Sequence, residues 1–389
     1  MTTPFVIEKD DDLDTRIPEA CDLMEKIYGE DKCYPRVTVR RTWSKHNPEI
    51  SGEMARPKAF RWYLKRELRK LARKGAQVGI EASRDRIDLA SPTVLESVDE
   101  ADVDLRQKKL FLFAPERIEV SLKRLEHYTG TRVEDFQRYI LLTNYTMHMN
   151  VFQEIYPDCL RPERDVQMPA YHHVAEDNTG ISIVNIGVGP SNAKTCTDHL
   201  AVLRPDALVM VGHCGGIRNH QEIGDFVLAS GYMRADLVLD DLLPTSVPVA
   251  PSFLLNRYLA LALDNASLRY RTGTVYTTAD RNWEFHFDRT RHDLSASRSL
   301  AIDMESATVA ANGFRYRIPN ATLLCVSDKP LHGALKLPNK AREFYRESQR
   351  QHLIVATQAL ESVKADWPQG LPTSSIRALD EPLMGASPD

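Results

Sequence analysis

The segment TLLCVSDKPLHGALKLP, residues 322–338, joins a short apolar run to a polar loop. The run at 323–326 is continuous rather than alternating, which is typical of a strand covered on both faces by helices. It ends at Ser327, Asp328 and Lys329. In sheets of that kind, ligands gather at the carboxyl ends of the strands. These three polar side chains are therefore the first candidates for a functional site.

Further apolar runs of the same kind begin at about residue 138. They are rich in β-branched residues and alternate with segments of helical character: YILLTN, ISIVNIG, ALVMVG, FVLAS, TGTVYTT and LAID. Strands that alternate with helices pair into a sheet with helices on both faces. The sequence therefore predicts an α/β domain built on a twisted central sheet.

The first part of the chain, to about residue 135, is more charged and more helical. Its segment 56–75 repeats apolar residues on one helical stripe: Phe60, Leu64, Leu68 and Leu71. The segment 115–130 has the same pattern and predicts a second helix. The basic residues on the other faces of 56–74 are either an effector or phosphate surface or a solvated helix face.

Composition excludes several classes of protein. The 389 residues carry 50 basic and 54 acidic side chains, and this balance argues against a nucleic-acid partner. No run approaches the roughly 18 apolar residues of a membrane helix, and the acidic N-terminus does not resemble a signal peptide. The six cysteines have no metal-ligand spacing. We therefore expect a cytoplasmic, reduced protein with no metal site.

Two runs end in glycines, which let the backbone approach a ligand closely. The first run is followed by Gly187 and Gly189, and the second by Gly212, His213, Gly215 and Gly216. Each glycine turn is either a ligand wall or a tight connection without a ligand. His213 either lines a site or is a core histidine satisfied by the main chain.

The remaining runs end in other polar groups. The run before residue 279 is followed by Arg281, Asn282 and Trp283, which either border a planar base or pack structurally. Asp303 and Glu305 are expected at the start of a helix, where they favour the helix dipole or accept hydrogen bonds from vicinal hydroxyls. A partly desolvated Asp328 is either a turn cap or a general acid with a raised pKa.

Taken in order, these motifs resemble the nucleoside phosphorylase/nucleosidase superfamily, whose members cleave N-glycosidic bonds. The matching elements are GVG, GHCGG, a base-edge segment, DMESA and VSD. The motif sequences are more similar to those of the AMP nucleosidase family, through NIGVGPSNAKT, DRNWE, AIDMESAT and LLCVSDKPLHG. In the first half of the chain, RLEHYTGT and LLTNYT also resemble that family. The resemblance covers the chain from about residue 56.

The resemblance implies an organisation and an activity. It implies a smaller α+β N-terminal domain at 1–135 with a regulatory or oligomerisation role, a nucleoside phosphorylase-like catalytic domain at 136–365, and a C-terminal tail at 366–389. The activity is hydrolysis of AMP, with water as second substrate, to adenine and ribose 5-phosphate. A homohexamer, activation by ATP and inhibition by phosphate are implied as well, with no cofactor in the reaction.

It also implies a role for each site residue. Asp328 protonates or hydrogen-bonds N7 of the leaving adenine, where an acid contributes most. Glu305 and the Met304 main chain hold the ribose hydroxyls, and the Met304 thioether packs under the sugar. Asn282 and Trp283 line the base, Ser327 orients Asp328, and Arg281 and Lys329 are candidates to bind phosphate. The two glycine turns border the ribosyl side and the incoming nucleophile: Gly187, Gly189, His213, Gly215 and Gly216.

One departure from the superfamily concerns the nucleophile. Its phosphorylases have Arg-Val-Gly-Ser where this chain has Met-Val-Gly-His at 210–213. The missing arginine and serine clamp inorganic phosphate, so the replacement favours water. The cation that meets the 5′-phosphate of AMP stays open among four residues: Arg281, Lys329, His332 and Lys336.

Three alternatives remain. They are a purine nucleoside phosphorylase, a nucleosidase that acts on adenosine, and a non-catalytic nucleotide sensor on the same fold. The presence of both Glu305 and Asp328 argues against the sensor.

Overall fold

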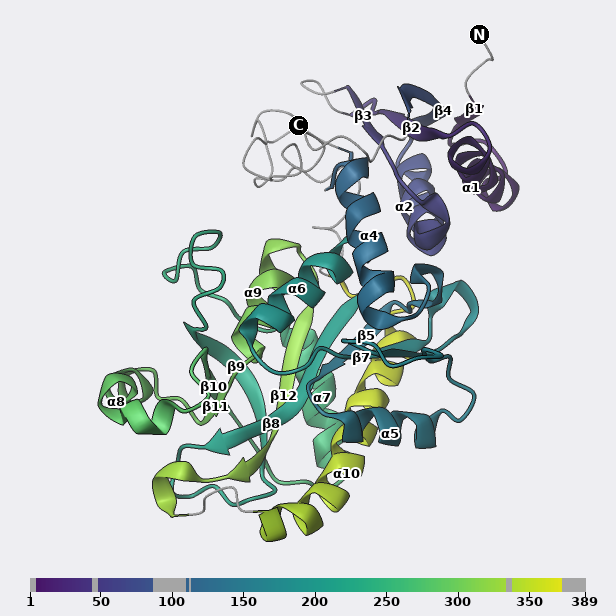
Figure 1. Cartoon of the computed structure of the whole chain (residues 1–389). Helices are drawn as coiled ribbons and strands as arrows, with labels where there is room; N and C mark the ends of the chain where they lie inside the picture. Colours follow the sequence, from purple (N-terminus) through teal and green to yellow (C-terminus); the bar gives the residue numbers. More distant parts are fainter. Residues whose placement is uncertain (1–4, 44–47, 87–109, 112, 334–337, 373–389) are drawn as a thin grey trace. The chain divides into compact units, whose positions relative to one another are not determined.

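The structure is a computed structural model (Figure 1), and it describes residues 5–43, 48–86, 110–111, 113–333 and 338–372. Lys336 and most of the predicted tail, 373–389, lie outside the described residues. The chain divides into two compact units, residues 1–124 with 202–204 and 373–389, and residues 125–201 with 205–372. Among the helices of the described residues, none combines the length and apolar character needed to cross a membrane.

The first unit contains a four-stranded antiparallel sheet in the order β1-β4-β2-β3. Helices α1 and α2 pack on it. This arrangement confirms the smaller α+β domain. The bounds are β1 Phe5–Ile7, α1 Leu13–Gly29, β2 Cys33–Arg40, β3 Glu49–Glu53, α2 Arg61–Arg73 and β4 Gln77–Arg86.

Helix α2 buries the predicted apolar stripe, and its basic face is only partly solvated. Leu64, Leu68 and Leu71 are buried. Arg66 is also buried, and its Nε lies 3.0 Å from the Oε1 atom of the equally buried Glu67. A buried guanidinium needs such a partner because an unpaired charge is expensive to desolvate. Arg66 therefore does not belong to a free basic surface.

The second predicted helix is α4, Pro115–Thr129, and it ends at Gly130 as the sequence indicates. The φ angle of Gly130 is +70°, a left-handed conformation that closes a helix readily when the residue is glycine.

The second unit is built on an eight-stranded sheet in the order β11-β10-β9-β12-β8-β5-β7-β6. Every predicted apolar run is one of its strands. The antiparallel edge strand β6 is an addition that the sequence pattern did not indicate. The bounds are β5 Tyr139–Thr143, β6 Ala170–His173, β7 Ile181–Asn185, β8 Ala207–Gly216, β9 Phe226–Ala235, β10 Tyr270–Thr278, β11 Ala301–Asp303 and β12 Asn320–Asp328.

Part of this sheet closes on itself. Strand β11 pairs with β10 on one side and antiparallel with β8 on the other. Strands β8, β12, β9, β10 and β11 therefore form a closed ring, while β5, β7 and β6 extend from it. Closure removes an open strand edge and brings the ends of non-neighbouring strands together.

Helices cover the sheet on both faces, as the continuous apolar strands predicted (Figure 1). Helices α5, Thr146–Ile155, α7, Phe253–Asn265, and α10, Pro338–Asp366, share one large apolar core with the strands. Helices α6, Pro190–Leu200, and α9, Ser306–Arg315, pack against each other, and α9 also packs on β8, β9, β10 and β12. The predicted α/β domain, a central sheet flanked by helices, is therefore confirmed.

Candidate active site

The closed ring of strands brings two predicted site segments to one point, Gly215 of β8. Ile302 of β11 is its antiparallel register partner, and Asp328 of β12 is its parallel partner. Glu305 follows Ile302 by three residues, so both predicted catalytic carboxylates leave strands that flank the same glycine. A Cβ on Gly215 would lie 3.1 Å from Ile302 Cγ2 and 3.4 Å from Pro330 Cδ, so the neighbouring side chains pack closely over this position.

Glu305 is held by hydrogen bonds from two other elements. Its Oε1 accepts the main-chain N–H of Gly189 at 2.6 Å, and its Oε2 accepts the side-chain Nδ2–H of Asn144 at 3.0 Å. The side chain is 2% exposed. A buried carboxylate with one donor on each oxygen has a fixed orientation, which a group that binds vicinal hydroxyls requires.

The electrostatics of Glu305 are unusual for a carboxylate. Burial, followed by the neighbouring Asp303 carboxylate, raises the pKa of Glu305 well above its ordinary value. Burial also raises the pKa of Asp303, although that carboxylate accepts hydrogen bonds from Ser306 and from Thr277 Oγ1, the latter at 2.6 Å. Two neighbouring buried acids resist ionising together, so the folded protein favours a proton on this pair.

The predicted start of helix α9 needs a correction. Asp303 is the last residue of β11, Glu305 is the N-cap, and the helix itself begins at Ser306. Asp303 Oδ2 accepts the main-chain N–H of Ser306 at 2.9 Å. The carboxylate of Asp303 is favourable for the dipole of helix α9. The side chain of Glu305 makes no capping bond and instead accepts the main-chain N–H of Gly189.

Asp328 lies where β12 meets its loop, after an irregularity in the register between Val326 and Asp328. The Ser327 hydroxyl donates to Asp328 Oδ1 at 2.6 Å and lies 3.3 Å from the carbonyl oxygen of Cys214. Ser327 is buried and Asp328 is partly exposed. Ser327 is therefore placed to fix the orientation of an acid that solvent or a ligand can reach.

The glycine turn after β7 contributes a main-chain donor to the site. Gly187 and Gly189 have φ angles of +71° and +105°, in a region that side chains disfavour. Gly189 is the N-cap of α6 and gives its N–H to Glu305. The glycines predicted to follow the second run lie inside β8, at its end, and are close-packed as well, since a Cβ on Gly216 would lie 2.8 Å from Val326 Cγ1.

The segment 281–283 contains one buried and two exposed side chains. Trp283 is 5% exposed and packs in a small apolar cluster with Tyr276 and Ile302. Arg281 and Asn282 are exposed. The Trp283 ring therefore serves the packing under β10 and β11, and only its two neighbours present free polar groups to solvent.

Other predicted residues have identifiable surroundings. Lys329 Nζ donates to the carbonyl oxygen of Asn219 at 2.9 Å, and His332 Nε2 lies 3.0 Å from the carbonyl oxygen of Ile217. Met304, which lies between Asp303 and Glu305 in the sequence, is half-buried. His213 is buried, with its ring 4.5 Å from that of Tyr145.

The structure adds Asn144 to the site, a residue to which the sequence analysis gave no role. Asn144 directly follows β5, so the rule that polar residues after strands form the site applies to it as well. Its separation from Glu305 in the sequence hid the contact.

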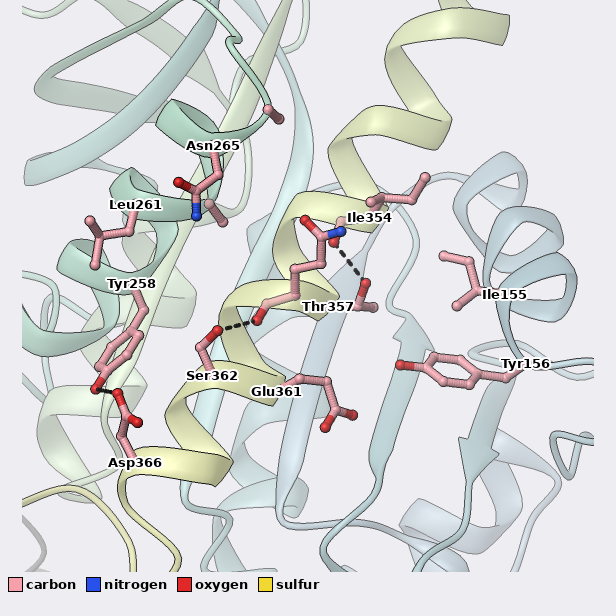
Figure 2. A pocket seen from close by; sticks show the side chains of 13 residues that line it. Ile155, Tyr156, Tyr258, Leu261, Asn265, Ile354, Thr357, Glu361, Ser362 and Asp366 are labelled. Carbon is pink, nitrogen blue, oxygen red and sulfur yellow. Dashed lines mark hydrogen bonds between the residues drawn. The ribbon is translucent and has the colours of Figure 1, made fainter.

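A surface hollow lies elsewhere in the second unit, along α5, α7 and α10 (Figure 2). Its wall includes Tyr156, Tyr258, Thr357 and Glu361. None of the predicted site residues lines it, so it is separate from the strand ends described above.

Comparison with known proteins agrees with this geometry. The model of the phosphorylase superfamily matches residues 160–361. An AMP nucleosidase of Escherichia coli K12 is 44% identical over 309 residues, covering 69% of this chain and 64% of the relative. The chain thus spans less than two thirds of that relative's length.

Solved structures give the same picture. An AMP nucleosidase of Bacteroides thetaiotaomicron superposes with a TM-score of 0.54 at 34% identity, covering 64% of this chain and 99% of that chain. A uridine phosphorylase of Vibrio fischeri superposes with a TM-score of 0.53 at 18% identity, covering 62% and 100%. The latter likeness concerns the fold alone.

Proposed function

The chain belongs to the phosphorylase superfamily, and on that basis we propose that it hydrolyses the N-glycosidic bond of AMP to adenine and ribose 5-phosphate. The relatives at 44% and 34% identity are AMP nucleosidases, which favours this member of the superfamily's reactions over the others. The enzyme is accordingly an N-glycosyl hydrolase.

The observation that carries the proposal is the fixed carboxylate of Glu305 beside the strand end that bears Asp328. Glu305 accepts N–H donors from Gly189 and Asn144, one on each carboxylate oxygen. Ribose presents two adjacent hydroxyl donors, which such a carboxylate binds in one orientation. The half-buried Met304 supplies an apolar contact for the sugar.

Asp328 then assists departure of the base. Cleavage leaves positive charge on the ribosyl ring and negative charge on the purine, so a proton or hydrogen bond at N7 lowers the barrier most. The hydroxyl of Ser327 orients Asp328. Because Asp328 is partly exposed, a substrate can reach it without rearrangement of β12.

Water is the proposed nucleophile. Met210 and His213 occupy the positions at which phosphorylases of this superfamily use arginine and serine, and both are buried. A buried Met210 supplies no cation for inorganic phosphate. The exposed Arg281 is our choice for the 5′-phosphate, since Lys329 and His332 already contact main-chain oxygens.

The proposal extends to assembly and regulation. We propose a cytoplasmic homo-oligomer, a hexamer by family resemblance, that ATP activates and phosphate inhibits. The resemblance of the first part of the chain to the N-terminal domain of AMP nucleosidases supports that regulatory role.

The test is incubation of the pure protein with AMP in phosphate-free buffer, with and without ATP, and separation of the products. Adenine with ribose 5-phosphate is expected, and a change in rate with ATP is expected for the regulatory part. Adenine and ribose 1-phosphate formed only from adenosine and phosphate would identify a phosphorylase instead. Binding of AMP without cleavage would identify a nucleotide sensor.

A further inference from the structure

Three buried histidines from different elements meet in the second unit. They are His148 of α5, His213 of β8 and His352 of α10. One ring nitrogen from each lies within 4.8 Å of the others. From this cluster and the contacts below, we infer that the three imidazoles form a binding site for a divalent transition-metal ion of the zinc type.

Two of the rings are oriented by bonds on their outer side. His352 Nε2 lies 2.7 Å from the carbonyl oxygen of Leu323, and His148 Nδ1 lies 2.7 Å from the Thr143 hydroxyl. A carbonyl only accepts, so the proton of His352 is on Nε2 and the lone pair on Nδ1 faces the cluster. Outer partners of this kind orient the histidine ligands of metals.

The inner nitrogens of the same two rings have no hydrogen-bond partner among the described residues. These atoms are His148 Nε2 and His352 Nδ1, and both side chains are fully buried. A buried polar atom without a partner destabilises the fold. Two such atoms aimed into one cluster are the observation that points to a ligand rather than to a packed core.

The ring spacing is close to that of ligands on one shared metal ion. The centroid separations are 5.1 Å between His148 and His352, 5.6 Å between His148 and His213, and 6.1 Å between His213 and His352. With zinc–nitrogen bonds of about 2.0–2.1 Å and tetrahedral angles, two imidazoles on one ion have centroids about 5.2 Å apart, so His148 and His352 already have this spacing and His213 has to move inward.

The chemistry of the donors selects the class of ion. Neutral imidazole suits Zn²⁺ and its first-row neighbours better than Ca²⁺ or Mg²⁺, which prefer oxygen ligands.

The position of the cluster gives the ion a structural role. His148 lies four residues after Asn144, which holds Glu305, and His213 lies two residues before Gly215. An ion here would fasten α5, which begins two residues after Asn144, and β8, which carries Gly215, to α10. The inference departs from the expectation of no metal site, which rested on close sequence spacing.

The experiment uses the full-length, untagged chain, stripped of metal and titrated with Zn²⁺, with Co²⁺ as a spectroscopic probe. One Zn²⁺ per chain, a rise in the melting temperature and the visible spectrum of tetrahedral Co²⁺ are expected. His352→Gln and His148→Gln are each expected to weaken Zn²⁺ binding at least 100-fold.

A matched control is His172→Gln. His172 is also fully buried in the same unit, but both of its nitrogens are bonded, to Ser182 and Thr131. It is expected to lose stability and keep Zn²⁺ binding. Less than one Zn²⁺ per unmodified chain, an octahedral Co²⁺ spectrum, or equal binding by the His352→Gln and His148→Gln variants would overturn the inference. The first two readouts need no variant to fold, and none depends on AMP cleavage.

Discussion

Glu305 accepts the main-chain N–H of Gly189 at 2.6 Å, across 116 residues of sequence. The bond joins the segment after β11 to the turn before α6, so the carboxylate is oriented by backbone rather than by a mobile side chain.

Asp328→Asn is expected to lower kcat for AMP by at least tenfold, about 1.4 kcal/mol of barrier, because an amide cannot give the purine a proton. Release of adenine, followed by chromatography, measures it. Asp241→Asn, at an exposed acid, is the control and should leave kcat unchanged. Turnover of Asp328→Asn within tenfold of the parent would remove Asp328 from the leaving-group role.

Glu305→Gln is expected to lose at least tenfold in kcat/KM with AMP, since the amide is a weaker acceptor for the ribose hydroxyls. With 2′,3′-dideoxy-AMP, which lacks those hydroxyls, the variant and the parent should differ little. Both substrates are compared at one pH in the same preparation. An equal loss with both substrates would mean that Glu305 acts on something other than the hydroxyls.

The stability of Glu305→Gln should depend on pH in a defined direction. Because the folded protein raises the pKa of Glu305 above 4.5, the stability that its proton contributes is complete below pH 4.5 and is lost as the pH rises through the folded value. The variant lacks this loss. Its free energy of unfolding should therefore gain on the parent by about 1 kcal/mol or more between pH 5 and 9.

Urea unfolding at several pH values measures that difference. A difference that stays constant across the range would mean that the folded protein leaves the pKa of Glu305 at its ordinary value.

Gly189→Ala is expected to destabilise the protein by about 1–3 kcal/mol and to lower activity with AMP. The φ and ψ angles of Gly189 are 105° and 157°, a region almost confined to glycine. No atom would obstruct the added Cβ, so the effect comes from the backbone and from the displaced N–H donor of Glu305.

Gly75→Ala is the matched control, because Gly75 also has a positive φ, +93°, and open space around it. It should lose comparable stability and retain activity at a temperature where both variants are folded. A fully active Gly189→Ala variant would show that the Gly189 bond does not position Glu305.

The strands of the second unit could be predicted from sequence because each is a continuous apolar run, and its site residues because they follow those runs. The edge strand β6 escaped the same reasoning. Its sequence, Ala170–His173, is short and half polar, and its pairing with β7 depends on the fold rather than on its own composition.

Long-range contacts were the second limit. Residues Asn144 and Glu305 meet, and so do His148, His213 and His352, only because the sheet brings distant segments together. The spacing of these residues in the sequence does not indicate that they are in contact. Similarly, a tryptophan beside polar residues does not reveal by itself that Trp283 packs inward against Tyr276.

The closed ring of strands also affects the order of events during folding. The pairing of Gly216 with Ala301 joins segments far apart in the chain, and contacts of that kind form late because a long loop must first be closed. Strands and helices on either side can form earlier from local sequence. Enzyme activity during refolding should thus recover after most of the circular dichroism signal, once the ring of strands has closed and the carboxylates are assembled.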